Sequence, residues 1–169
     1  MERDGERREN GSSQDSIAEE KEKGSGEAAA EPKSAVGKFP VVGLGASAGG
    51  LEALKTFFSH LPTNSGMAYI VLVHLSPEHP SMMPDLLQRT TSVPVKQAED
   101  GEVLQPDHIY VVPSHREISV YGGQIQLLEP LDKHVSLPID FFLRSLAAEQ
   151  GGRSAAVILS GTGADGTVG

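Results

Sequence analysis

The stretch that decides the fold is FPVVGLGASAGGLEALKTFFSHLP, residues 39–62, in which a short apolar run leads through a glycine-rich turn into an amphipathic segment. The run up to Gly45 has the length and the apolar character of a buried strand. One apolar stripe recurs at helical spacing after the glycines: Leu51, Leu54, Phe58 and Leu61. The stretch therefore predicts a strand, a tight turn that carries Ser47, and a helix.

The rest of the chain repeats this alternation. Residues 67–75 form a second apolar run, and two buried strands joined by a helix predict a parallel, right-handed βαβ unit. Two alternating runs flank Gly122 and Gly123, which indicates a β-hairpin. Further elements are expected at 81–89 (helix), 93–97 and 108–112 (strands), 138–150 (helix) and 155–161 (strand). The pattern predicts an α/β fold: a doubly wound, mostly parallel sheet with an antiparallel β-hairpin.

Composition excludes several classes of protein. The 169 residues suit one domain, and 14 basic against 23 acidic residues give a formal net charge of −9. That charge argues against nucleic acid and anionic membrane surfaces as partners. The absence of cysteine excludes disulfides and thiolate metal sites. No signal-peptide core and no run near the ~20 apolar residues of a membrane helix is present, so we expect a cytoplasmic protein without membrane insertion.

The sequence leads to a different prediction for each end of the chain. Residues 1–38 contain ten acidic and seven basic residues and almost no large apolar ones, so we expect a disordered N-terminal tail before a domain at 39–169. In a βαβ pattern a helix should follow the strand that ends near Ser160. The sequence stops at Gly169, so we expect the domain to be C-terminally incomplete.

Three residues that carry chemistry follow the three best strands. Ser47 follows the first strand, His74 the second and Asp165 the last. In an open α/β sheet the ligand crevice lies outside the carboxyl ends of the strands. A hydroxyl needs a base to remove its proton, imidazole suits that role near neutral pH, and a carboxylate orients the imidazole. The placement predicts a hydrolytic triad.

The residues around Ser47 match G-x-S-x-G, between Gly45 and Gly49. That motif needs a strand, a sharp strained turn and a helix, which is the context predicted here. The helix that starts near Gly49 would direct free N–H groups toward the serine and stabilise an oxyanion.

Each of these residues also has a structural explanation. Ser47 could be a helix N-cap, His74 a hydrogen-bonded histidine at a strand end, and Asp165 a turn or cap residue. The residues 43–48 satisfy the looser dinucleotide fingerprint G-x-G-x-x-G/A. That fingerprint expects an acid at the end of the second strand, where His74 stands instead. A dinucleotide site is therefore a less favoured alternative.

No cofactor or metal is expected. His74, Glu78 and His79 are the only plausible cluster of metal ligands, and their spacing matches no zinc pattern.

The chain resembles the CheB family of protein-glutamate methylesterases in five motifs: GLGASAGGLEAL, LVHLSPEH, AEDGE, HIYVVP and LSGTGADG. The resemblance implies hydrolysis of glutamate methyl esters on chemotaxis receptors or other signalling proteins, with glutamine deamidation as a related activity. It implies the triad Ser47, His74 and Asp165. Backbone N–H groups would support the oxyanion at Ala48, Gly49, Gly161, Thr162 and Gly163.

The departures from the family pattern point to a particular branch. The tail stands where the family has a phosphorylated receiver domain, so regulation by a receiver is not expected. Ala48 replaces a threonine and Val73 a glutamine, while Ser160 and Thr162 replace threonine and methionine in the late loop. These features resemble the module at the head of sensory proteins fused to methyltransferase and sensor domains. A catalytically inactive interaction module of such a protein is the alternative.

Overall fold

The computed structural model describes residues 39–73, 82–130, 137–160 and 165–169. The predictions made for residues 1–38, for His74, Glu78 and His79, and for Gly161, Thr162 and Gly163 lie outside the described residues. The side chains of Ala48 and Ser160 are also outside the description.

A five-stranded parallel sheet forms the centre of the described domain. The strands lie in the order β3 (Val95–Gln97), β4 (His108–Val111), β2 (Ala68–Val73), β1 (Val41–Ala46) and β7 (Ser154–Ser160). Val41 pairs with Ala68 on one side and with Ser154 on the other. The chain thus starts in β1, builds outward to β3, and returns to the opposite side of β1.

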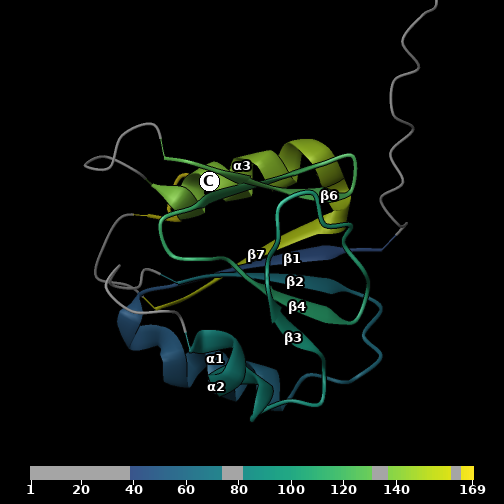
Figure 1. The fold of residues 1–169 in the computed structure, drawn as a ribbon, viewed down its shortest axis with the longest axis vertical. Helices are drawn as coiled ribbons and strands as arrows, with labels where there is room; N and C mark the ends of the chain where they lie inside the picture. Colours follow the sequence, from purple (N-terminus) through teal and green to yellow (C-terminus); the bar gives the residue numbers. More distant parts are fainter. Residues whose placement is uncertain (1–38, 74–81, 131–136, 161–164) are drawn as a thin grey trace, which may run out of the picture. The chain divides into compact units, whose positions relative to one another are not determined.

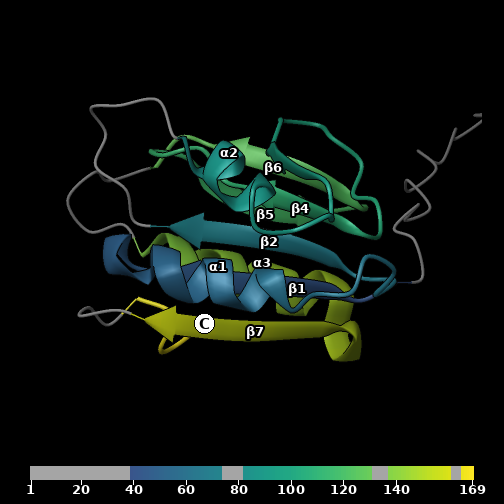
Figure 2. The same ribbon diagram turned by 90° about the horizontal axis from the view of Figure 1, so that it is seen from below.

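Helices cover both faces of this sheet, which confirms the doubly wound α/β fold (Figure 1). On one face lie α1 (Leu51–Ser59) and α2 (Met83–Gln88). On the other face lie α3 (Pro138–Gln150) and the hairpin of β5 (Glu117–Tyr121) and β6 (Gln124–Leu128). Figure 2, which views the domain from below, shows α1 in front of the sheet, running along β1 between β2 and β7.

The alternation of side chains along β1 creates two cores. Val42 and Leu44 face α1 and α2, where they join the buried Phe58. Val41 belongs to the opposite core with Phe142 of α3 and residues of the hairpin. The predicted helical stripe of α1 is confirmed, because Leu54 and Phe58 are buried and Leu51 and Leu61 pack against the same core.

The hairpin forms as predicted, with Gly122 and Gly123 at φ 56° and 78°. These positive angles suit a tight two-residue turn, for which glycine carries little strain. The hairpin is a separate two-stranded sheet that lies over the α3 face, so the main sheet is wholly parallel in the described residues. Backbone bonds from Gly101 to Ile125 and from Ile125 to Glu102 attach it to the segment before β4.

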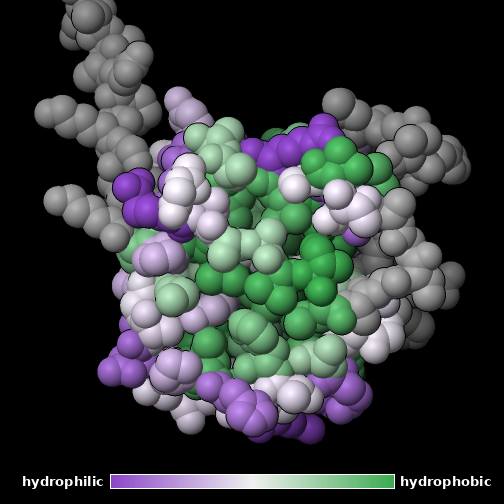
Figure 3. Space-filling model, turned by 180° about the vertical axis from the view of Figure 1, so that it is seen from behind, coloured by the Kyte–Doolittle hydropathy of each residue, from purple (hydrophilic) through white to green (hydrophobic). Residues whose placement is uncertain are grey.

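Strand β7 forms one edge of the sheet and exposes apolar residues. Ile158 is 44% exposed, and Ala155 and Ala156 are exposed as well. Figure 3, which views the domain from behind, shows a continuous apolar area on this side. Of the helices in the described ranges, none has the length and apolarity needed to cross a membrane.

Candidate active site

Ser47 lies directly after β1, where the chain leaves the sheet for α1. Its backbone has φ −76° and ψ 173°, which is ordinary extended geometry. The prediction from G-x-S-x-G that Ser47 lies in a strained turn is therefore wrong. The residues that follow form a 3₁₀ turn, Ala48–Gly50, and not the first turn of the α-helix. The helix α1 starts only at Leu51.

The Ser47 hydroxyl does not act as a helix cap. Ser47 occupies the N-cap position of the 3₁₀ turn, yet its side chain makes no capping hydrogen bond. The turn is closed by the backbone alone, with the Gly50 N–H donating to the Ser47 carbonyl at 2.8 Å. Since Gly50 is engaged in this way, the N–H groups of Ala48 and Gly49 remain the oxyanion candidates on this turn. Ser47 is half-buried, and Gly49 is exposed beside it.

Gly43 and Gly45 serve a different purpose from the one expected of a phosphate-binding loop. Both lie within β1 and face α3. A Cβ on Gly43 would lie 2.7 Å from Phe142 Cε1, and a Cβ on Gly45 would lie 2.9 Å from Ile139 Cγ2. These glycines let α3 pack close against the sheet, so the fold explains their presence without a bound dinucleotide.

The described segments that follow β1 and β7 in sequence lie on opposite faces of the sheet. After β1 the chain turns to α1, whereas residues 165–169 after β7 bond to the first turn of α3 on the other face. Neighbouring strands that diverge in this way define the switch point at which α/β proteins bind ligands. The pairing register also shifts there: Gly45 faces Ile158 and Ala46 faces Ser160. Such irregularities are common beside active sites.

Asp165 lies on the β7 side of this switch point and caps α3. Its Oδ2 accepts a hydrogen bond from the Ile139 N–H at 3.1 Å, and its Oδ1 accepts one from the Asp140 N–H at 2.9 Å. These are the second and third N–H positions of the helix, which an N-cap side chain normally satisfies. Leu137 holds the N-cap position and cannot do so. The capping explanation of Asp165 is thus confirmed, whereas its role toward His74 stays a prediction.

Asp140, which is bonded to Asp165 through its N–H, is a buried acidic residue that the sequence analysis did not single out. It is only 4% exposed, and its Oδ1 accepts bonds from the N–H groups of Val168 and Gly169 at 3.0 and 2.7 Å. An acidic residue at the third position of a helix normally lies at the surface, where its negative charge interacts favourably with the positive end of the helix dipole. The available signal was its place within the apolar run PIDFFL, which implies burial.

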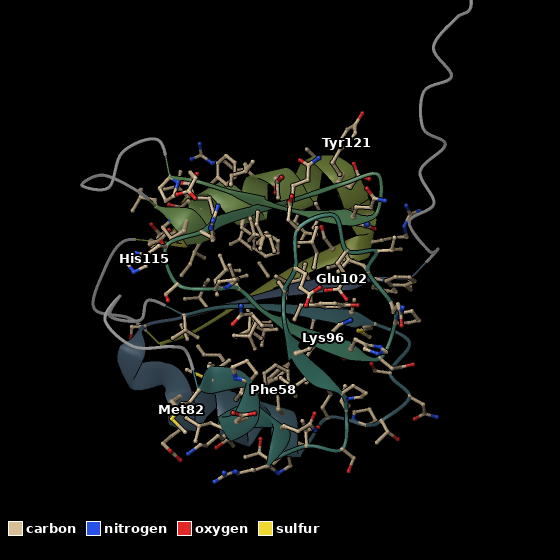
Figure 4. The ribbon with its side chains drawn as sticks, viewed as in Figure 1. Phe58, Met82, Lys96, Glu102, His115 and Tyr121 are labelled. Atoms are coloured by element: carbon tan, nitrogen blue, oxygen red, sulfur yellow. The ribbon has the colours of Figure 1, made fainter. Side chains whose placement is uncertain are left out.

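His115 also lies at the carboxyl edge of the sheet. It follows β4, is exposed, and has a positive φ of 66°, which is uncommon for a residue other than glycine. Figure 4 shows it at the left margin, the side at which the parallel strands end. Its neighbour Arg116 forms an ion pair with Glu129 at 2.6 Å.

The pKa shifts that are resolved belong to a cluster remote from Ser47. Lys96 on β3 forms an ion pair with Glu102, and the hydrogen bond to that carboxylate raises the Lys96 pKa (Figure 4). Burial raises the pKa of Tyr110, whose ring lies 5.2 Å from the Lys96 Nζ. Glu102 lies in the segment between β3 and β4 that bonds to the hairpin, so its ion pair with Lys96 attaches that segment to the sheet. Within the described ranges, no three His, Asp or Glu side chains gather in a way that could hold a metal.

Comparisons with known proteins agree with this architecture. The family model for CheB methylesterase matches residues 42–169. The protein-glutamate methylesterase/protein-glutamine glutaminase of Desulfotalea psychrophila is 31% identical over 140 residues, which are 79% of this chain and 38% of that protein. The protein of the same name from Salmonella typhi is 33% identical over 135 residues, 76% of this chain and 38% of that protein.

A solved structure provides the same assignment. The Thermotoga maritima CheB methylesterase catalytic domain superposes with a TM-score of 0.69 at 30% identity, covering 78% of this chain and 72% of that one. The present chain spans about two fifths of the length of its curated relatives. The family match extends from the second residue of β1 through Asp165 to the last residue. The chain belongs to the CheB methylesterase family.

Proposed function

We propose that this chain carries the catalytic residues of a protein-glutamate methylesterase. Such an enzyme hydrolyses γ-glutamyl methyl esters on a signalling protein to glutamate and methanol. The observation that carries the proposal is the position of Ser47. It follows β1, an inner strand of the sheet, at the switch point, and its hydroxyl is not used for capping. The names of the relatives support this substrate class, and they also support glutamine deamidation as a second reaction at the same site.

In this mechanism Ser47 Oγ attacks the ester carbonyl. His74 removes the serine proton and then protonates the departing methoxide, so that methanol leaves and a glutamyl ester of Ser47 remains. Water, deprotonated by the same histidine, hydrolyses that ester and restores the serine. Asp165 orients the histidine, and the N–H groups of Ala48 and Gly49 stabilise the negative oxygen, together with those of Gly161, Thr162 and Gly163.

The capping bonds of Asp165 are compatible with this role. Each carboxylate oxygen carries two lone pairs. The bonds from Ile139 and Asp140 use one acceptor site on each oxygen. The carboxylate therefore keeps capacity for a histidine N–H while the helix N-terminus holds it still.

We also propose that the enzyme acts in the cytoplasm on methylated receptors or similar signalling proteins, alone or fused to methyltransferase and sensor domains. The family membership supports this assignment.

The test is methanol release from a peptide that contains a γ-glutamyl methyl ester. We expect Ser47→Ala to abolish release while the fold persists, because the hydroxyl caps nothing. Ser59→Ala is the matched control: this serine lies at the other end of α1, where its Oγ bonds to Thr56 and His60. Release that continues in Ser47→Ala would contradict the triad. No release from the unmodified chain would favour an interaction module without turnover.

A further inference from the structure

Two carboxylates in this domain each accept backbone N–H groups from the segment that carries the other. Asp165 accepts the N–H groups of Ile139 and Asp140, and Asp140 accepts those of Val168 and Gly169. The four bonds run in both directions between the first turn of α3 and residues 165–169. We call this arrangement the carboxylate clasp.

The clasp is the polar attachment of a segment that has no regular structure of its own. Residues 165–169 form no helix or strand, and Gly166 has a φ of 88°. The segment nevertheless lies tightly on the helix, because a Cβ on Gly169 would be 2.8 Å from the Asp140 Cα. Without the Asp140 carboxylate, two of the four N–H bonds that hold Asp165 in place would be lost.

The environment of Asp140 differs from that of an acidic residue that only interacts with a helix dipole. Such residues act from the surface, whereas Asp140 is 4% exposed. Burying a carboxylate is costly unless hydrogen bonds compensate. Here Oδ1 receives two N–H bonds, while Oδ2 is buried without a partner among the described residues. A buried carboxylate oxygen without a partner among the described residues calls for an explanation beyond helix stability.

We propose that Asp140 is a positioning residue for Asp165, an inference that rests on the catalytic role proposed for Asp165. By holding residues 165–169 against α3, Asp140 keeps the Asp165 carboxylate on the Ile139 and Asp140 N–H groups. The orientation of the catalytic carboxylate is thereby coupled to the start of α3. Displacing a catalytic group by about 1 Å can reduce turnover by about 10²-fold.

The test compares Asp140→Ala with Asp140→Asn in the whole chain. Asparagine keeps an oxygen where Oδ1 accepts the Val168 and Gly169 N–H groups, and alanine does not. For methanol release we expect kcat to fall about 10²-fold in Asp140→Ala with KM changed less than about twofold, because positioning and not binding is lost. Asp140→Asn should restore kcat to within about tenfold of the unmodified chain.

Asp100→Ala is the matched control for lost stability. Asp100 is exposed, and its Oδ1 accepts a single backbone N–H, that of Leu127 on the hairpin at 2.8 Å. We expect this variant to lose thermal stability and to keep its kcat. Equal kcat in Asp140→Ala and the unmodified chain, or an equal loss in Asp140→Ala and Asp140→Asn, would overturn the proposal.

Hydrogen exchange separates this inference from the proposed activity. In Asp140→Ala the amides of residues 139 and 140 should lose protection, because Asp165 no longer stays against them. They should keep it in Asp100→Ala. If the unmodified chain releases no methanol, the proposed function fails, and the exchange data alone decide the clasp. Unchanged protection at residues 139 and 140 in Asp140→Ala would overturn it.

Discussion

Replacing Gly43 with alanine tests why β1 contains glycine. The added Cβ would lie 2.7 Å from Phe142 Cε1 and 3.0 Å from Leu143 Cδ2. Carbon atoms in contact normally lie about 3.5–4.0 Å apart, so the ring must move by roughly 1 Å. Phe142 is fully buried, which leaves the ring little space for that shift.

The size of the effect follows from two opposing contributions. Overpacking a core costs about 1–3 kcal/mol. Replacing glycine restricts the unfolded chain and recovers about 0.4–1 kcal/mol. We therefore expect Gly43→Ala to lower the free energy of unfolding by about 1–2 kcal/mol, measured by urea denaturation followed by circular dichroism.

Two other glycines calibrate this result. Gly45→Ala should cost a similar amount, because the new Cβ would lie 2.9 Å from Cγ2 of the buried Ile139, although its other neighbour, Ile158, is 44% exposed and can move outward. Gly152 has nothing within 4 Å of its Cβ position, so Gly152→Ala should stabilise the protein by about 0.4–1 kcal/mol. If Gly43→Ala is as stable as Gly152→Ala, the packing explanation of the β1 glycines is refuted. Combining Gly43→Ala with Phe142→Leu should cost less than the sum of the two changes, since the shorter side chain relieves the contact.

Three further outcomes are expected. Asp165→Ala should lower the unfolding free energy by about 1 kcal/mol through loss of the α3 cap, and Asp165→Asn by less; an intact Tm in Asp165→Ala would contradict the cap. Stability should decline as pH rises above the ordinary pKa values of 10.0 for Tyr110 and 10.5 for Lys96, because both groups hold their protons more tightly in the folded state. In urea titrations between about pH 9 and 11, Tyr110→Phe should flatten that decline, and an unchanged slope would exclude Tyr110 as a source. Ala156→Lys places a charge on the exposed edge strand and should reduce concentration-dependent light scattering while changing the unfolding free energy by less than about 0.5 kcal/mol; undiminished scattering would show that the β7 edge does not drive association.

The parts of the fold that follow from local pattern were predictable from sequence. The apolar stripe with Leu54 and Phe58 predicted a helix with one buried face. Gly122 and Gly123 between two alternating runs predicted a tight hairpin turn. The ends of the elements shifted by a few residues, as at β3, which begins at Val95 and not at Val93. Such ends depend on pairing with β4 and not on the apolar pattern alone.

The site was harder to predict, because its geometry depends on residues distant in sequence. Gly43 and Gly45 precede Ser47, and their sequence pattern matched a dinucleotide fingerprint and, for Gly45, the G-x-S-x-G motif. Their actual constraint comes from Phe142 and Ile139 on α3. Asp165 was predicted from its loop, but its bonds to α3 and the reciprocal role of Asp140 needed the folded chain. Ser47 is the opposite case, since a strand end is a local property.

The position of β1 between β2 and β7 has a consequence for folding order. Val41 pairs with Ala68, which is close in sequence, and also with Ser154, which is synthesised much later. Contacts between distant residues form slowly because a long loop must close first. During synthesis β1 can therefore assemble with α1 and β2, while its glycine-bearing face stays uncovered until α3 and β7 emerge. We therefore expect the β1–β7 pairing beside Ser47 to form after the β1–β2 pairing, so that the edge of the sheet proposed as the active site is completed late in folding.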